Sequence, residues 1–141
     1  MKQSLPLFIL LSFFLFTNCE NTLDCIINVR PVLPHKSLEI GLVNRYYSEI
    51  ITAEIKNEPR DNDYEYYYEI SGEIPEGLEV IFDYRDVIIE GTPLKSGRFS
   101  FTIYLDVDPP YSYYYDDDGN ERYNDDLCSD NTSKRYTIAI K

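Results

Sequence analysis

RFSFTIYLDV, residues 98–107, is the stretch of sequence that decides the fold. Apolar and polar side chains alternate along it, and successive side chains of an extended chain point to opposite faces. One face of this segment carries Phe99, Phe101, Ile103, Leu105 and Val107. The alternation predicts an antiparallel strand with one buried face and one solvated face.

The same two-residue period recurs along the chain, and no stretch has the period of a long amphipathic helix. Strands are predicted at residues 47–55, 64–70, 78–82, 87–90 and 135–141, with weaker candidates at 26–29 and 37–42. Glycine and proline separate these segments, as turns require. Seven or eight short strands of this kind predict an all-β fold, specifically a β-sandwich.

The alternation also assigns side chains to the core. Inward positions on the flanking strands are Ile51, Ala53, Ile55, Tyr136, Ile138 and Ile140. In YEYYYEI, residues 64–70, we expect Tyr66 and Tyr68 to pack in the core and Tyr67 to face outward.

Four blocks of sequence occur in a fixed order: YYYEI at 66–70, IPEGLEV at 74–80, IEGTP at 89–93 and GRFSFTI at 97–103. Together they resemble an immunoglobulin-like domain family that is grouped with cadherin-like and dystroglycan-type domains. The resemblance implies a Greek-key sandwich of about seven strands within residues 37–141. It implies no single activity, because such sandwiches serve many functions.

Residues 1–18 have the features of a signal peptide. The run LPLFILLSFFLF, residues 5–16, has no charge and no strongly polar side chain, but it is shorter than the roughly 20 residues that a spanning helix needs. Cys19 follows shortly after this run. The segment therefore predicts export of the chain.

LFTNC, residues 15–19, resembles the lipobox of bacterial lipoproteins, although Phe16 and Asn18 depart from its usual residues. The resemblance implies cleavage before Cys19, lipidation of Cys19 and attachment to the membrane of a bacterial cell envelope, with the outer membrane as the expected location. Residues 19–36 would then form an N-terminal tether and the first strand. A plain secretory signal and an uncleaved anchor are the alternatives.

The chain has three cysteines, Cys19, Cys25 and Cys128. If Cys19 carries lipid, two remain, and an exported protein would pair them. We therefore predict a Cys25–Cys128 disulfide, with two free thiols as the alternative.

An acidic, tyrosine-rich insertion at residues 108–134 separates the two last predicted strands of the sandwich. Nine acidic residues lie between Asp106 and Asp130, and Arg122 alone opposes them. The Asp118-Gly119 pair is typical of a hairpin turn, so this segment is expected to extend the sheet as a ribbon. A loop of this length is usually functional or disordered.

Three interpretations of the insertion stay open. It could be a solvated loop that keeps the surface polar. It could be a recognition surface for a protein or glycan, because tyrosine offers rigid contact area with a polar tip. The candidate contact residues are Tyr111, Tyr113, Tyr114, Tyr115 and Tyr123.

The third interpretation is calcium binding, because hard cations prefer carboxylate and carbonyl oxygens. The candidate ligands are Asp106, Asp108, Asp116 and Asp118. The spacing does not match an EF-hand loop, since Tyr114 stands at a ligand position.

The formal net charge of −12 argues against general nucleic-acid binding, because an acidic chain repels phosphates. His35 is the single histidine and has no nucleophile at a recognisable spacing. We therefore predict a non-enzymatic, lipid-anchored binding or adhesion module. The alternatives are a structural accessory lipoprotein of an envelope complex and a calcium-stabilised cadherin-like domain.

Overall fold

The structure is a computed structural model that describes residues 25–110, 113–123 and 127–141. Its strands are β1 (Arg30–Val32), β2 (Tyr47–Thr52), β3 (Glu54–Lys56), β4 (Glu65–Gly72), β5 (Leu78–Asp83), β6 (Asp86–Gly91), β7 (Gly97–Asp108), β8 (Tyr113–Tyr115), β9 (Glu121–Tyr123) and β10 (Asn131–Ile140). A short 3-10 turn, η1 (Asp61–Asp63), precedes β4. The described residues contain no α-helix.

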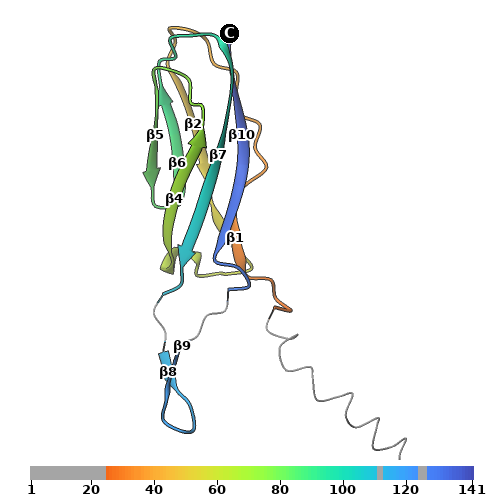
Figure 1. The fold of residues 1–141 in the computed structure, drawn as a ribbon, viewed down its shortest axis with the longest axis vertical. Coiled ribbons are helices and arrows are strands. Elements are labelled where there is room, and N and C mark those ends of the chain that lie inside the picture. The colour runs from red at the N-terminus through yellow and green to blue at the C-terminus, as the bar shows by residue number, and fades with distance from the viewer. Residues whose placement is uncertain (1–24, 111–112, 124–126) are drawn as a thin grey trace, which may run out of the picture.

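Two antiparallel sheets of three strands form the layers of a sandwich (Figure 1). One sheet has the order β10-β7-β4, and the other has the order β2-β6-β5. Strands β1 and β3 form a two-stranded sheet, as do β8 and β9. The architecture confirms the predicted all-β, immunoglobulin-like sandwich.

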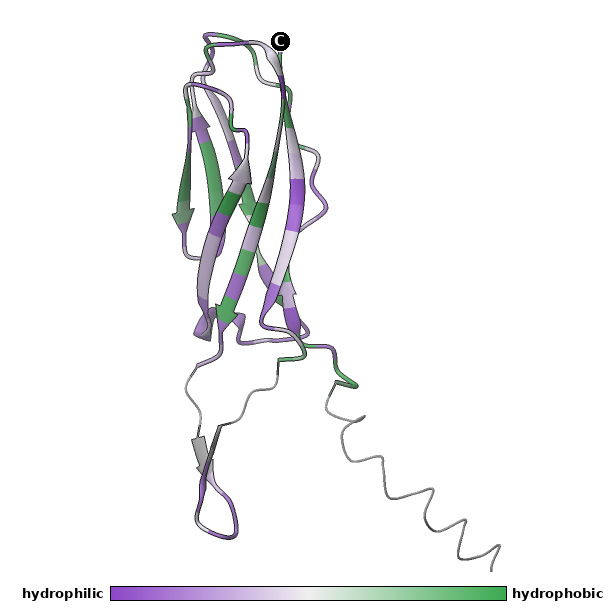
Figure 2. Ribbon diagram, in the orientation of Figure 1, coloured by the Kyte–Doolittle hydropathy of each residue, from purple (hydrophilic) through white to green (hydrophobic). Residues whose placement is uncertain are grey.

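The core lies between the two layers and follows the predicted alternation. Along β7, hydrophobic and hydrophilic residues alternate (Figure 2), and Ile103 and Leu105 are completely buried. Phe101 stacks on Tyr136 of β10 with ring centroids 5.9 Å apart. The opposite layer contributes the fully buried side chains of Ile51, Val87 and Ile89. Burial of an aliphatic side chain of this size stabilises the fold by about 1.5–3 kcal/mol.

The segment predicted as one strand at 47–55 is instead two strands in different sheets. β2 pairs with β6 as far as Thr52, and β3 pairs with β1. Ala53 lies between them, fully buried, and its N–H donates to the carbonyl oxygen of Arg85 over 2.8 Å. Both strands keep the predicted inward face, because the break leaves Ile51, Ala53 and Ile55 buried.

The IPEGL and GTP blocks are two turns that pack directly on each other. The N–H of Thr92 donates to the carbonyl oxygen of Gly77 over 2.9 Å. Gly77 and Gly91 have φ of 93° and 136°, a region that side chains with a Cβ rarely adopt. A Cβ on Gly91 would lie 2.2 Å from the carbonyl oxygen of Gly77. The two blocks are therefore one structural unit, which explains why they occur together in sequence.

The two weaker strand candidates were wrong in detail. Residues 26–29 form no strand, and β1 begins at Arg30. Residues 37–42 contribute a single bridge, between Gly41 and Ile140. The second segment meets the end of β10 only around Gly41, whose N–H donates to the carbonyl oxygen of Ala139 over 2.9 Å, so it forms no continuous strand pairing.

Candidate functional site

The insertion leaves the sandwich after β7 and is closed at its base by backbone pairing. Asn131, at the start of β10, pairs with Asp106 of β7. The N–H of Val107 donates to the carbonyl oxygen of Asp130 over 2.8 Å. β10 therefore begins at Asn131, which makes the insertion shorter than the predicted range of 108–134.

The predicted disulfide between Cys25 and Cys128 is present and fixes the returning end of the insertion. The two Cα atoms are 5.6 Å apart. The N–H of Cys128 also donates to the carbonyl oxygen of Val29 over 2.8 Å. The N-terminal segment and the end of the insertion are thus joined by a covalent bond and by a backbone hydrogen bond.

Within the insertion, β8 and β9 form a hairpin. Tyr115 pairs with Glu121, and the turn between them is organised by Asp116. One carboxylate oxygen of Asp116 accepts the N–H of Asp118 over 3.1 Å and the N–H of Asn120 over 2.8 Å. The expectation that this hairpin extends the main sheet was wrong, because β8 and β9 pair with each other in a separate sheet.

The candidate tyrosines divide between the hairpin and the undescribed part of the insertion. Tyr113 and Tyr114 lie in β8, and Tyr123 lies in β9. Tyr115 exposes 65% of its surface. Tyr111 lies outside the described residues, as do the predicted signal peptide and Cys19.

The four candidate calcium ligands do not come together. Asp106 and Asp108 lie at the end of β7, whereas Asp116 and Asp118 lie in the β8–β9 turn. Across the described ranges, no group of three or more histidine, cysteine or acidic side chains is placed to hold a metal ion. The arrangement therefore gives no support to a shared calcium site.

Two exposed tyrosines lie on the outer face of the β10-β7-β4 sheet. Tyr67 of β4 is 54% exposed, as predicted, and pairs in register with Asp106. Tyr104 of β7 is 43% exposed and pairs with Glu69. Sequence reasoning did not select Tyr104 as a contact residue, although its place on the polar face of 98–107 was the available signal.

Aromatic side chains close the side of the sandwich between the edge strands β4 and β5. Tyr68 stacks on Phe82 with ring centroids 5.4 Å apart. Tyr66 meets Tyr84 edge to face at 5.3 Å. Burial raises the pKa of both Tyr66 and Tyr68 above the usual tyrosine value. The two tyrosines therefore pack against the core, half-buried, as expected.

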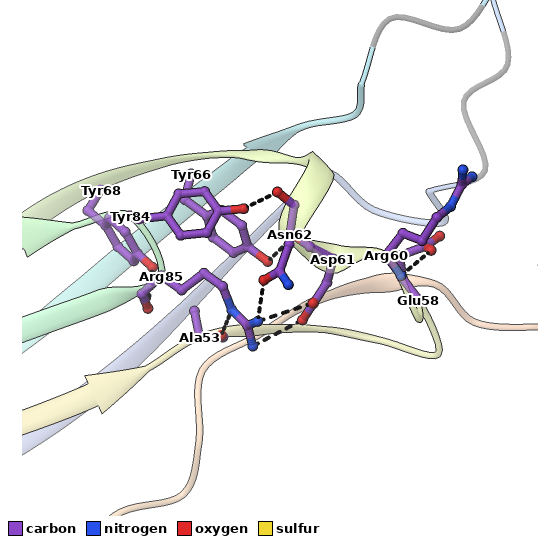
Figure 3. A network of polar contacts seen from close by, with 9 residues as sticks. All are labelled: Ala53, Glu58, Arg60, Asp61, Asn62, Tyr66, Tyr68, Tyr84 and Arg85. Carbon is purple, nitrogen blue, oxygen red and sulfur yellow. Dashed lines mark hydrogen bonds and ion pairs between the residues drawn. The ribbon is translucent and has the colours of Figure 1, made fainter.

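Beside these rings, Arg85 makes a set of polar contacts that we call the Arg85 clamp (Figure 3). This clamp was not predicted from the sequence. Its guanidinium contacts both carboxylate oxygens of Asp61, at 3.1 and 3.0 Å, and donates to the side-chain oxygen of Asn62 over 3.0 Å. It also donates to the carbonyl oxygen of Ala53 over 3.1 Å. The hydroxyl of Tyr68 in turn donates to the carbonyl oxygen of Arg85 over 2.9 Å. The clamp thus joins the β5–β6 turn to η1 and to the break between β2 and β3.

Within the described ranges, no helix is both long enough and apolar enough to cross a membrane. This finding leaves the predicted anchor at Cys19 untested, because residues 1–24 lie outside those ranges.

Comparison with known proteins gives similarity of fold. No family model matches the sequence, and no curated protein matches it. Among solved structures, one match is the endo-fucoidan hydrolase MfFcnA4 of glycoside hydrolase family 107. The match covers 82% of this chain and 14% of the hydrolase chain, at 18% identity and a TM-score of 0.50.

Two immunoglobulin-like domains also match. The match to murine CRIg covers 79% of this chain and 98% of the CRIg chain, at 12% identity and a TM-score of 0.47. The match to titin domain M7 covers 82% of this chain and 97% of the titin domain, at 11% identity and a TM-score of 0.42. The chain spans 14% to 18% of the length of the matched proteins that are described as glycosidases. Identities this low carry no activity over to this chain.

Proposed function

We propose that this chain is a non-enzymatic, lipid-anchored binding module of the bacterial cell envelope, and that the β8–β9 hairpin contacts a protein or a glycan. The observation that supports this proposal is the way the insertion is attached to the sandwich. Its base is closed by the β7–β10 pairing and by the Cys25–Cys128 disulfide, while the hairpin forms a separate sheet with Tyr115 exposed. A base fixed in this way lowers the entropy lost when the insertion binds a ligand.

The proposed anchor would set the orientation of this hairpin. Cys25 lies six positions after Cys19 in sequence, and an extended chain spans at most about 3.6 Å per residue, or roughly 20 Å. Since Cys25 is bonded to the end of the insertion, lipidation of Cys19 would hold the hairpin end of the sandwich close to the membrane. A ligand of the hairpin would then be a component of the same membrane or of its adjacent polymer layer.

The anchor and the hairpin need separate tests. Mass spectrometry of the mature chain should show acylated Cys19, and an unmodified Cys19 would refute the anchor. For the hairpin, a chain in which a short Gly-Ser link replaces residues 111–126 should lose binding to a glycan array or to a solubilised envelope fraction, while its melting temperature stays close to that of the unchanged protein. Unchanged binding would refute the role of the hairpin.

A point variant sharpens this test. Tyr115→Ala should weaken the same binding, because it removes an exposed aromatic surface. Tyr46→Ala is a matched control, since Tyr46 is 68% exposed and belongs to neither the hairpin nor the strands beside it. An equal loss of binding in both variants would indicate a nonspecific aromatic effect.

A structural accessory role has one observation in its favour. Ile50, Ile88 and Ile81 pair across β2, β6 and β5 in one row on the outer face of that sheet. Ile50 is 46% exposed and Ile81 is 39% exposed. A partner subunit of an envelope complex would pack against this exposed apolar row. Ile50→Lys should then release a stoichiometric partner from solubilised membranes, and recovery of no partner with the unchanged chain would refute this role.

A further inference from the structure

A hollow of about 280 Å³ lies between β1 and the start of β10. A second hollow of about 190 Å³ shares His35 and Lys134 with the first one. We call the two together the β1–β10 trough. Its walls come from the segment that follows β1 and from the first half of β10, the edge strand of its sheet.

The trough is cationic on a protein that is otherwise acidic. The chain has 25 acidic and 13 basic residues, yet neither hollow has an aspartate or glutamate in its lining. The first hollow is lined by Arg30, His35 and Lys134, and the second adds Lys36 and Arg135. A concave surface lined by one sign of charge concentrates ligands of the opposite sign.

Two of these basic side chains already have partners within the fold. Lys36 forms an ion pair with Glu49 at 2.5 Å, and Lys134 donates to the carbonyl oxygen of Leu33 over 3.0 Å. Arg30 and His35 have no hydrogen-bond or ion-pair partner for their side chains within the part of the chain that the structure describes. Their donors are therefore available to a ligand in the first hollow.

The remaining lining suits a hydroxylated ring. The hydroxyl-bearing residues Thr132 and Ser133 also line the hollow, and the partly exposed Val32 is an apolar residue in its wall. Sites that bind small ligands combine an apolar surface with a few converging polar groups in this way.

We propose that the β1–β10 trough binds an acidic saccharide. Its carboxylate or sulfate lies against Arg30 and His35 through charge-assisted hydrogen bonds. The ring hydroxyls contact Thr132, which lies on the same face of β10 as Lys134, and the C–H face of the ring covers Val32. The site uses no residue of the β8–β9 hairpin and does not depend on Cys19, so it stands or falls separately from the proposed function.

Binding is tested with the full chain at 150 mM salt, where charges farther apart than about 8 Å are largely screened. The probes are oligogalacturonate, which carries carboxylates, sulfated dextran oligosaccharide, neutral dextran oligosaccharide and oligoglutamate, each titrated by calorimetry. At least one of the two acidic saccharides should bind, and the comparison between them shows whether the anion is a carboxylate or a sulfate. Neutral dextran and oligoglutamate should bind at least tenfold more weakly.

Matched variants locate the site. Arg30→Gln and His35→Gln should each weaken binding of the acidic saccharide by about tenfold, the effect of losing one charge-assisted hydrogen bond. Arg45→Gln makes the same charge change as Arg30→Gln, at an exposed arginine outside the trough, and should have no effect. Melting curves verify that each variant is folded.

Four outcomes would overturn the proposal. They are no binding of either acidic saccharide at millimolar concentration, equal binding of neutral dextran, tighter binding of oligoglutamate, and an equal loss in Arg45→Gln. The third outcome would reassign the trough to an acidic peptide, and the fourth would reduce it to overall electrostatics.

Discussion

Arg85 contacts Asp61 through two pairs of atoms, at 3.1 and 3.0 Å, and so ties the turn after β5 to the turn before β4. The two residues are 24 positions apart in sequence. Planar contact of this kind is specific to arginine, because its guanidinium presents parallel N–H donors. The clamp closes one side of the sandwich from outside the core.

Substitution of Arg85 should therefore destabilise the fold. Arg85→Ala leaves Asp61 and the carbonyl oxygen of Ala53 without a donor, at a cost of about 2 kcal/mol in the free energy of unfolding. Arg85→Lys should recover less than half of this loss, since an ammonium cannot make both contacts to Asp61. Urea unfolding measures both variants. A loss no larger than that of Arg45→Ala, at an exposed arginine, would show that the clamp contributes nothing.

The disulfide predicts a second stability effect. Cys25 and Cys128 are separated by 103 residues, and loss of a native disulfide typically costs about 2–5 kcal/mol. The Cys25→Ser/Cys128→Ser double variant should lower the melting temperature while keeping the far-ultraviolet circular dichroism of a sandwich. Reductant should shift the unchanged protein in the same direction and leave the double variant unaffected. A shift of the double variant in reductant would mean that the bond is not the cause.

The contact between the two turns predicts a difference between glycines. Gly91→Ala places a Cβ 2.2 Å from the carbonyl oxygen of Gly77, in addition to the strain of a φ of 136°. Gly119 also has a positive φ, of 78°, but a Cβ there meets no atom within 4 Å. We expect Gly119→Ala to cost about 1 kcal/mol, and Gly91→Ala to cost at least about 2 kcal/mol more. Equal losses would show that the close approach of the turns does not matter.

The buried Glu49 predicts a coupling with Lys36. Glu49 is 7% exposed, accepts the N–H of Glu39 over 2.9 Å and pairs with Lys36 at 2.5 Å. Lys36→Met leaves a buried carboxylate without its cation and should cost about 1–3 kcal/mol. Adding Glu49→Gln removes that charge, so the double variant should be more stable than the sum of the two single variants predicts. Additive losses in chemical unfolding would contradict this coupling.

Buried tyrosines predict loss of stability at high pH. Burial raises the pKa of Tyr47 and Tyr136 to about 12. Because the folded pKa exceeds the unfolded value of about 10, the contribution is fully present below pH 10 and is lost as the pH rises toward 12. The free energy of unfolding should therefore fall between about pH 10 and pH 12.

Tyr136→Phe tests the assignment. It removes a hydrogen bond to the carbonyl oxygen of Pro34, of length 2.9 Å, and should cost about 1 kcal/mol at neutral pH. It should also reduce the fall at alkaline pH, because one buried ionisable group is gone. A steeper fall in the variant than in the unchanged chain would contradict this account.

Alternation along single strands was sufficient to predict most of the core. Phe101, Ile103 and Leu105 are buried because period-two alternation allows one face of β7 to be covered throughout. The same logic failed at Ala53, where the apolar pattern continues but the hydrogen bonds change partner. Periodicity reports which face is buried and does not report which strand is adjacent.

The candidate site divides in the same way. Cysteine count and export predicted the Cys25–Cys128 bond, and the residue types of the insertion indicated a hairpin at Asp118-Gly119. The separate sheet of that hairpin was not predictable, because the sequence does not state whether a ribbon continues an existing sheet.

The sequence by itself determined the strand period, the buried faces and the disulfide partners, because each depends on local pattern or on counting residues of one type. The tertiary structure decided the switch of sheet at Ala53, the Arg85 clamp and the β1–β10 trough. The trough joins residues about 100 positions apart, such as Leu33 and Lys134. Such residues come into contact only because strands distant in sequence pair with each other in the folded chain, so the local sequence pattern does not reveal the contact.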